Sequence, residues 1–95
     1  MFHFAEIFKA LSNQNRLEIF RLIRSLEDRS QQDPSRGPCC VGDICKEFEV
    51  SPSTVSHHLK ELRNVGLINV ERKGQFFYIS INREVFLSVK GFFEE

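Results

Sequence analysis

The sequence predicts a mainly α-helical domain that contains one small β-hairpin, and three observations lead to this prediction. Apolar residues recur every three or four positions in five segments, which is the spacing of one helix face. Two short runs of β-branched and aromatic residues flank a glycine-containing turn, a pattern typical of a hairpin. The whole chain, residues 1–95, has the length of a single domain. The expected order is therefore four helices, two strands and a last helix.

The first two helices are predicted from apolar stripes that Ser12 and Asn13 separate. The stripes consist of Phe4, Ile7, Phe8 and Leu11 in the first helix, with Phe2 in front of it, and of Ile19, Leu22, Ile23 and Leu26 in the second. Arg16, Arg21 and Arg24 fall on the outer surface of the second helix. We interpret them as a solvated face rather than a nucleic-acid contact.

A polar segment from Glu27 to Pro38 follows and is predicted to be a loop, because two prolines and a glycine interrupt it. It is longer than most connections in a compact domain, which is typical of a mobile or functional loop. The segment brings the adjacent Cys39 and Cys40 to the start of the third helix.

Two helices joined by a tight turn are predicted between residues 41 and 64. The apolar stripe of the first consists of Val41, Ile44, Cys45 and Phe48. Glu49, Val50 and Ser51 form the turn, and Ser51 can cap the next helix, where Pro52 fits the first position. The stripe of this fourth helix consists of Val55, Leu59 and Leu62. This is the helix-turn-helix arrangement.

The opposite face of the fourth helix is polar and nearly free of acids. It consists of Ser53, Ser56, His57, Lys60 and Asn64. Short hydroxyls, a histidine and a lysine can approach base edges and phosphates closely, so this face is typical of a recognition helix. An alternative for Ser53 and Thr54 is that they only help to cap the helix. His58 lies at the margin of the apolar stripe, where we expect a hydrogen-bonded packing role.

The predicted strands lie directly behind this helix, at residues 67–72 and 76–81, with Lys73, Gly74 and Gln75 as the turn. A hairpin in this position is a wing, and Arg72, Lys73 and Gln75 would lie at its tip. The predicted architecture is therefore a winged helix-turn-helix.

The last helix can begin after Asn82 and is rich in aromatic residues. Six of the ten phenylalanines lie in the first and last helices: Phe2, Phe4, Phe8, Phe86, Phe92 and Phe93. On a monomer they would expose a large apolar patch, so we expect a homodimer formed through these two helices. The alternative is that the two helices fold back and complete a single core.

Three segments make the chain resemble the ArsR/SmtB-type winged-helix repressors of bacteria and archaea. They are residues 10–17, residues 53–62, and Gly66-Leu67-Ile68 followed by Arg72-Lys73-Gly74-Gln75. The resemblance extends from Phe4 to Phe93, and the chain has Gln14 where the family often has proline. It implies a homodimeric repressor that leaves its DNA when it binds metals, metalloids or oxidised sulfur.

The charge balance favours local contacts over bulk attraction to nucleic acid, because thirteen basic and thirteen acidic residues cancel. A dimer would place two recognition helices in successive major grooves of double-stranded DNA, about 34 Å apart on an inverted-repeat operator. The expected DNA contacts are Ser53, Thr54, Ser56, His57, Lys60, Arg72, Lys73 and Gln75.

The cysteines are the candidate sensor. Residues Cys40 to Cys45 resemble the Cys-Val-Cys-Asp-Leu-Cys signature of arsenic-responsive family members, with Gly42 in place of the middle cysteine. Cys39 restores three thiols, the number that As(III) prefers, so Cys39, Cys40 and Cys45 are candidate metal ligands. Binding would have to unwind the helix start, because positions 40 and 45 face apart on a regular helix. The alternatives are a redox or persulfide role for Cys39 and Cys40, or no sensing, with Cys45 a small core hydrophobe.

Other classes of protein fit the sequence less well. An enzyme would need a carboxylate to orient His57 or His58 beside Ser56, and no such pattern is present. A protein-interaction module would be expected to carry acids in place of Ser53, Ser56 and Lys60. No apolar run approaches the roughly 20 residues of a membrane span, so we expect a cytoplasmic protein that contacts no membrane and folds without a cofactor.

Overall fold

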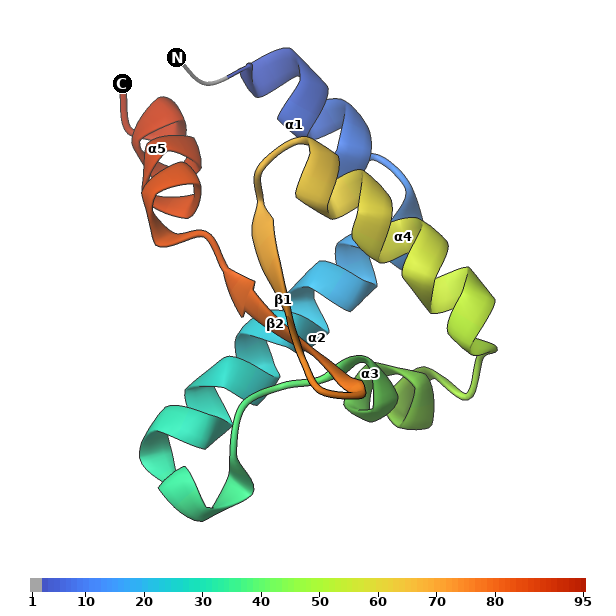
Figure 1. Cartoon of the computed structure of the whole chain (residues 1–95). Helices are drawn as coiled ribbons and strands as arrows, with labels where there is room; N and C mark the ends of the chain where they lie inside the picture. The colour runs from blue at the N-terminus through green and yellow to red at the C-terminus, as the bar shows by residue number, and fades with distance from the viewer. Residues whose placement is uncertain (1–2) are drawn as a thin grey trace.

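The computed structural model describes residues 3–95. Its elements are α1 (Phe4–Leu11), α2 (Gln14–Gln32), the short 3₁₀ helix η1 (Pro34–Arg36), α3 (Val41–Phe48), α4 (Pro52–Asn64), β1 (Ile68–Lys73), β2 (Phe76–Ile81) and α5 (Arg83–Phe93) (Figure 1). The five predicted helices and the hairpin are confirmed in this order, while Phe2 lies outside the described residues. Within residues 3–95, the helices are too short or too polar to cross a bilayer.

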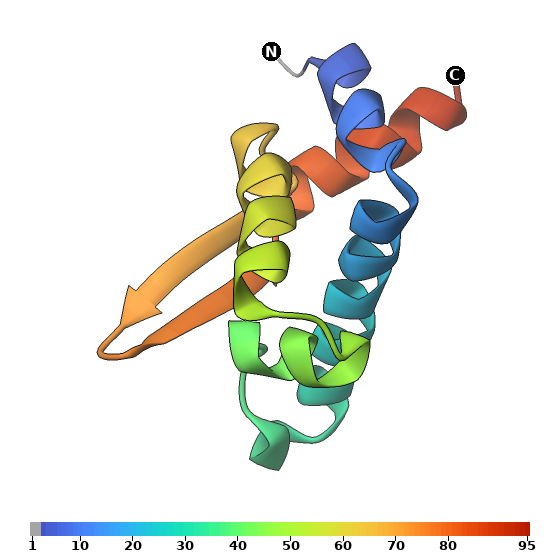
Figure 2. The ribbon, with the colours of Figure 1, turned by 90° about the vertical axis from the view of Figure 1, so that its right-hand side faces the viewer.

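The core lies where α2, α3, α4 and the base of the hairpin meet. Its fully buried large side chains are Ile7, Ile19, Ile23, Ile44, Val55, Leu62, Leu67 and Ile68. Helix α4 lies beside α2, α3 packs across the ends of both, and the hairpin extends from this body as an arm on the α4 side (Figure 2). The apolar stripes read from the sequence therefore face one another.

The turn between α3 and α4 is set by the residues at the two helix ends. Glu49 ends α3 in a left-handed conformation, with φ of 53°. The Ser51 hydroxyl accepts a hydrogen bond from the Thr54 N–H at 3.3 Å, and Pro52 occupies the first helical position, as predicted. Because the stripe of α4 is buried, the polar face of this helix is left on the outside.

The hairpin has a tighter turn than the sequence predicts. Lys73 ends β1 and pairs with Phe76 of β2, so the turn contains only Gly74 and Gln75. Gly74 has φ of +62°, the conformation that a type II′ turn requires at its first central position and that glycine adopts without strain.

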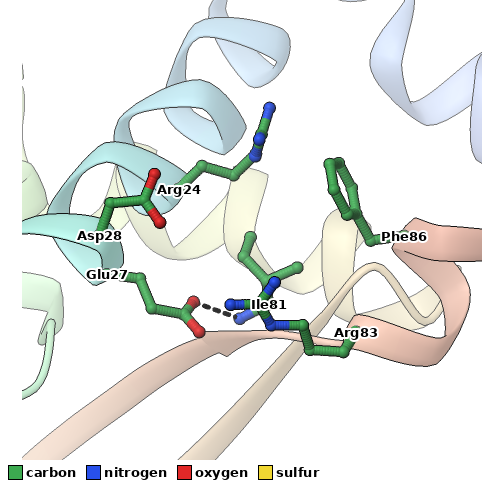
Figure 3. A pocket seen from close by; sticks show the side chains of 6 residues that line it. All are labelled: Arg24, Glu27, Asp28, Ile81, Arg83 and Phe86. Atoms are coloured by element: carbon green, nitrogen blue, oxygen red, sulfur yellow. Dashed lines mark hydrogen bonds between the residues drawn. The ribbon is translucent and has the colours of Figure 1, made fainter. Parts of the chain in front are cut away.

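The predicted loop from Glu27 to Pro38 is wrong over its first half, because α2 continues to Gln32. Residues 27–32 are polar and lack an apolar stripe, but several of them are good helix formers. The Glu27 carboxylate accepts a hydrogen bond from the Ile81 N–H at 2.9 Å, which joins this part of α2 to the end of β2 (Figure 3). Pro34 follows the end of α2 and begins η1.

Aromatic rings pack together where α1 and α5 lie side by side. The ring of Phe92 lies 5.1 Å from that of Phe4 and 5.2 Å from that of Phe8, measured between centroids. Phe93 nevertheless remains 72% exposed and Leu87 58% exposed. The homodimer stays a prediction, and these helices retain apolar surface on which it could form.

The hydrogen bond from the Ile81 N–H to Glu27 predicts a measurable loss of stability in Glu27→Ala. The half-buried N–H would lose its acceptor, so we expect a loss of about 1–3 kcal/mol in the free energy of unfolding, measured by urea denaturation. Glu27→Gln retains an acceptor oxygen and should lose less. Asp28→Ala, at the exposed neighbouring position, should change the value by less than about 0.5 kcal/mol. Equal losses in Glu27→Ala and Asp28→Ala would contradict the role assigned to this hydrogen bond.

Candidate nucleic-acid interface and cysteine segment

Helix α4 and the hairpin are neighbouring elements (Figure 2). The outer face of α4 and the tip of the hairpin carry exposed polar side chains. All of the side chains that the sequence predicts as DNA contacts are exposed: Ser53, Thr54, Ser56, His57, Lys60, Arg72, Lys73 and Gln75. Glu61, the acid within α4, is half-buried instead. The structure thus leaves these residues accessible, while their contact with DNA stays a prediction.

Three hydroxyls gather at the N-terminus of α4. The Ser51 hydroxyl lies 3.1 Å from that of Ser53 and 2.9 Å from that of Thr54. Ser53 and Thr54 therefore share in the cap of the helix, as the alternative interpretation expected, and both remain exposed to solvent. A phosphate or base edge that approached them would find hydroxyls already ordered at a helix N-terminus.

The basic side chains of the wing, Arg72 and Lys73, interact with other residues of the hairpin. The Arg72 Nε donates to the Gly74 carbonyl oxygen at 3.1 Å, and the Arg72 guanidinium lies 5.7 Å from the centroid of the Phe77 ring. Lys73 Nζ lies 3.8 Å from a carboxylate oxygen of Glu71, and both side chains are well exposed, so this ion pair is weak. Lys73 thus stays available to a phosphate.

Two exposed rings beside the tip were not predicted from the sequence. Phe76 is 50% exposed and Phe77 is 45% exposed. Alternation along a strand sends them to opposite faces of the hairpin, so only one of them can face α4. Their aromatic run predicted a strand but gave no sign that its first two residues would lie beyond the core.

His58 is buried in α4, as its place beside the apolar stripe predicts, but the predicted hydrogen bond is wrong for its Nδ1. The residue is 8% exposed, and Nδ1 has no hydrogen-bond partner within residues 3–95. Burial, and then the charge of Arg16 and the presence of His57, lower the pKa of His58 from 6.5. Its surroundings therefore favour the neutral form of the ring over the charged form.

Arg16 does not lie on the solvated face to which the sequence assigned it. Its guanidinium donates to the Ala10 carbonyl oxygen at 3.1 Å and is partly buried. A carbonyl close to the end of α1 attracts the positive charge, which explains the inward position. Arg16 thus fixes the α1–α2 turn beside His58.

The adjacent cysteines connect the helix-turn-helix to the wing through their backbone. The Cys39 carbonyl oxygen accepts a hydrogen bond from the Ile79 N–H of β2 at 2.9 Å. Cys40 is the N-terminal cap residue of α3, and its N–H donates to the Asp43 carboxylate at 3.0 Å. A change at this pair would therefore act on α3 and on β2 together.

The three thiols have different surroundings. Cys39 is 5% exposed, and burial, together with the nearby Asp43, Cys40 and Glu27, raises its pKa to about 12. Cys40 and Cys45 are half-buried, and Cys45 packs against the core as a small apolar residue. Cys39 is thus a protonated thiol at neutral pH, which is a poor metal ligand until it is exposed and deprotonated.

The cysteines do not form a preformed metal site. Across the described residues, His, Cys, Asp and Glu side chains are nowhere gathered in a group of three that could hold an ion. Ligation by Cys39, Cys40 and Cys45 stays a prediction, and it requires the start of α3 to unwind, as the positions of Cys40 and Cys45 in the sequence predict.

The chain matches known proteins over most of its length. Residues 35–70, which contain α3, α4 and the turn between them, match the family model described as bacterial regulatory protein, arsR family. Transcriptional repressor SdpR of Bacillus subtilis is 35% identical over 83% of this chain and 76% of that protein. An arsenical resistance operon repressor of the same organism is 40% identical over 81% of this chain and 64% of that protein.

A second group of similarities adds a cadmium-related protein and solved structures. The cadmium resistance transcriptional regulatory protein CadC homolog of Staphylococcus aureus is 36% identical over 84% of this chain, which spans 58% of that protein. The structure of HlyU from Vibrio cholerae has a TM-score of 0.68 at 26% identity, covering 90% of this chain and 83% of that one. A crystal structure described as an ArsR family transcriptional regulator has a TM-score of 0.72 at 23% identity, covering 96% and 88%.

The lowered pKa of His58 predicts a pH dependence of stability. The unfolded chain protonates this histidine near pH 6.5, whereas the folded chain resists the proton. The free energy of unfolding should therefore fall as pH drops below 6.5 toward the lower pKa of the folded state, and the loss should be absent above that window. Urea denaturation at about pH 7.5 and about pH 5 measures it.

The matched variants are His58→Gln and His57→Gln. The first should reduce the difference in unfolding free energy between the two pH values, because the buried titrating group is gone. The second removes an exposed histidine of the same helix and should preserve most of the difference in unfolding free energy between the two pH values. If His58→Gln keeps the full difference, another group is responsible.

Proposed function

Because the chain belongs to the arsR family of bacterial regulatory proteins, which bind DNA and are not enzymes, we propose that it represses transcription as a homodimer on an inverted-repeat operator. The observation that carries this proposal is the exposed polar face of α4 beside an exposed basic wing. The buried apolar stripe of α4 anchors this helix in the core, so its outer side chains can contact the major groove of DNA without loss of core contacts.

The two elements have different roles in this proposal. Ser53, Ser56 and His57 approach base edges in the major groove, and Lys60 contacts a phosphate. Lys73 and Gln75 contact the backbone or the adjacent minor groove from the wing. With no net charge over the chain, affinity depends on two such sets acting together, which is the reason for a dimer.

The dimer is proposed to form through α1 and α5. The exposed rings and side chains at Phe92, Phe93 and Leu87 supply the apolar surface. Placing the two-fold axis there leaves α4 and the wing of each protomer free for DNA, so the proposed interface and the proposed reading surface do not overlap.

We further propose that a thiol-binding ion, such as As(III), releases the repressor through Cys39, Cys40 and Cys45. Relatives named for arsenical and cadmium resistance support this class of inducer. Cys39 must leave its buried position and Cys40 must give up the cap of α3 before three thiols can meet. The same movement breaks the hydrogen bond from Ile79 to the Cys39 carbonyl, so it disturbs the wing as well.

Lys60→Glu and His57→Ala should weaken DNA binding without unfolding the protein, since both side chains are exposed. We expect at least about a tenfold loss of affinity for Lys60→Glu and a salt dependence that is shallower by about one counterion per protomer. The measurement is a mobility-shift titration on a two-fold-symmetric operator at several salt concentrations.

Arg21→Glu is the control for this experiment, because it makes the same charge change on the exposed face of α2. It should leave affinity close to that of the parent. Equal affinity of the parent, Lys60→Glu and His57→Ala would show that the outer face of α4 does not contact DNA.

Titration of the DNA complex with As(III), Sb(III), Cd(II), Zn(II) and polysulfide tests the inducer. We expect a thiophilic ion to release the reduced parent protein and to have no effect on a variant with serine at Cys39, Cys40 and Cys45. Should that variant fail to fold, Cys40→Ser alone, at a half-buried position, provides the comparison. If only polysulfide releases the protein, the inducer is an oxidised sulfur species and the proposal of a bound ion is wrong. If the serine variant responds like the parent, the three thiols are not the sensor.

A further inference from the structure

A groove of about 410 Å³ lies between α4 and the hairpin, and its lining residues include none of the three cysteines. Its apolar lining comes from three parts of the fold: Val41 at the start of α3, Leu59 of α4, and Val70 and Phe77 of the two strands. A volume in this range and a largely apolar lining are properties of sites that bind small organic molecules.

The charged side chains that line the groove are all of one sign. Lys60 and Arg63 lie on α4, one turn apart, and no acid lines the groove within the described residues. A third cation, Arg72, lies 5.7 Å from the centroid of the Phe77 ring, on the strand that pairs with Phe77. The groove therefore combines an apolar wall with a cationic edge, which complements a molecule with an apolar body and one negative charge.

The apolar wall is open to water in the free protein. Phe77 is 45% exposed, although aromatic side chains gain free energy when they are buried. Leu59, in contrast, is only 4% exposed and gives the groove a floor that belongs to the core. A planar apolar group could thus cover Phe77 without any rearrangement of the fold.

We propose that this groove binds an amphipathic organic anion with the chemistry of an aromatic carboxylate. Its ring system lies against Leu59, Val70 and Phe77, and its carboxylate faces Lys60 and Arg63. Cys39, Cys40 and Cys45 do not line this site, so it would respond to a different class of molecule from a thiophilic ion.

Binding at this site has a consequence for DNA, and this step rests on the proposed function. Ser56 and Lys60 line the groove and also belong to the outer face of α4 that is proposed to contact DNA. A bound carboxylate would neutralise Lys60 and occupy the space beside it. The anion and a DNA phosphate therefore compete for the same edge of α4.

Naphthoate is the probe for this site, titrated into the whole protein without DNA and followed by its fluorescence and by amide NMR spectra. We expect saturable binding of one molecule per chain, with the shifted amides concentrated at residues 59–63, 70 and 77. Naphthalenemethanol, which has the same ring system without the charge, should bind at least about tenfold more weakly. Inorganic phosphate should not displace naphthoate, because it cannot use the apolar wall.

Phe77→Ala and Arg63→Gln should each weaken naphthoate binding by about tenfold. Their controls are Phe76→Ala, an equally exposed ring on the other face of the same strand, and Arg21→Gln on α2. Both controls should bind naphthoate like the parent. Shifts spread over α1 and α5, equal binding of the neutral alcohol, or displacement by phosphate would each overturn the proposal.

Competition is measured separately, by adding naphthoate to the DNA complex. A rise in the apparent Kd for DNA is expected in the parent, and about ten times more naphthoate should be needed for the same rise in Phe77→Ala. If naphthoate binds at the groove but DNA binding itself is absent, the proposed function fails and the ligand site stands. If DNA binds and naphthoate does not, the ligand site fails alone.

Discussion

Burial of the apolar stripe of α4 is the interaction on which the rest of the structure depends. Val55, Leu59 and Leu62 are almost completely buried in the core, where α4 packs against α2, α3 and the base of the hairpin. At about 100° per residue, fixing these three side chains also fixes the direction of the others on the helix. The serine- and histidine-bearing face must then point outward, and the next sector of the helix must face the hairpin. The proposed reading surface and the proposed anion groove thus both follow from one packing contact.

The wing is tied to the body at its base and not at its tip. Ile79 donates its N–H to the Cys39 carbonyl, and Ile81 donates its N–H to the Glu27 carboxylate. One of these bonds connects β2 to the segment before α3, and the other connects β2 to α2 (Figure 3). A disturbance at the cysteines can therefore reach the wing through the pairing of Cys39 and Cys40 with β2, whereas the two-residue turn lies at the far end of the hairpin.

The periodicity of apolar residues was enough to predict the helices, the hairpin and the exposed face of α4. A chain of this size forms a single core, so every apolar stripe must face that core. The end of α2 could not be predicted in this way, since residues 27–32 have no stripe and Glu27 finds its partner in Ile81, far along the chain. The inward turn of Arg16 also depends on tertiary neighbours, as does the burial of His58, whose Nδ1 has no hydrogen-bond partner within residues 3–95. The groove could not be predicted from the sequence for the same reason, because its walls come from α3, α4 and the hairpin and meet only in the folded structure. The resemblance to a cysteine signature of the family suggested the three cysteines as a group, but Cys39 is buried whereas Cys40 and Cys45 are half-buried.

The most direct test of the central claim is a dimethyl sulfate footprint of the protein bound to its operator. This reagent methylates guanine N7 in the major groove and adenine N3 in the minor groove, so it reports which groove each part of the protein occupies. Two clusters of protected guanines, about ten base pairs apart and related by the symmetry of the operator, are the result that a paired α4 predicts. Protection of a single cluster, or protection confined to adenine N3, would show that α4 is not seated in the major groove of two half-sites.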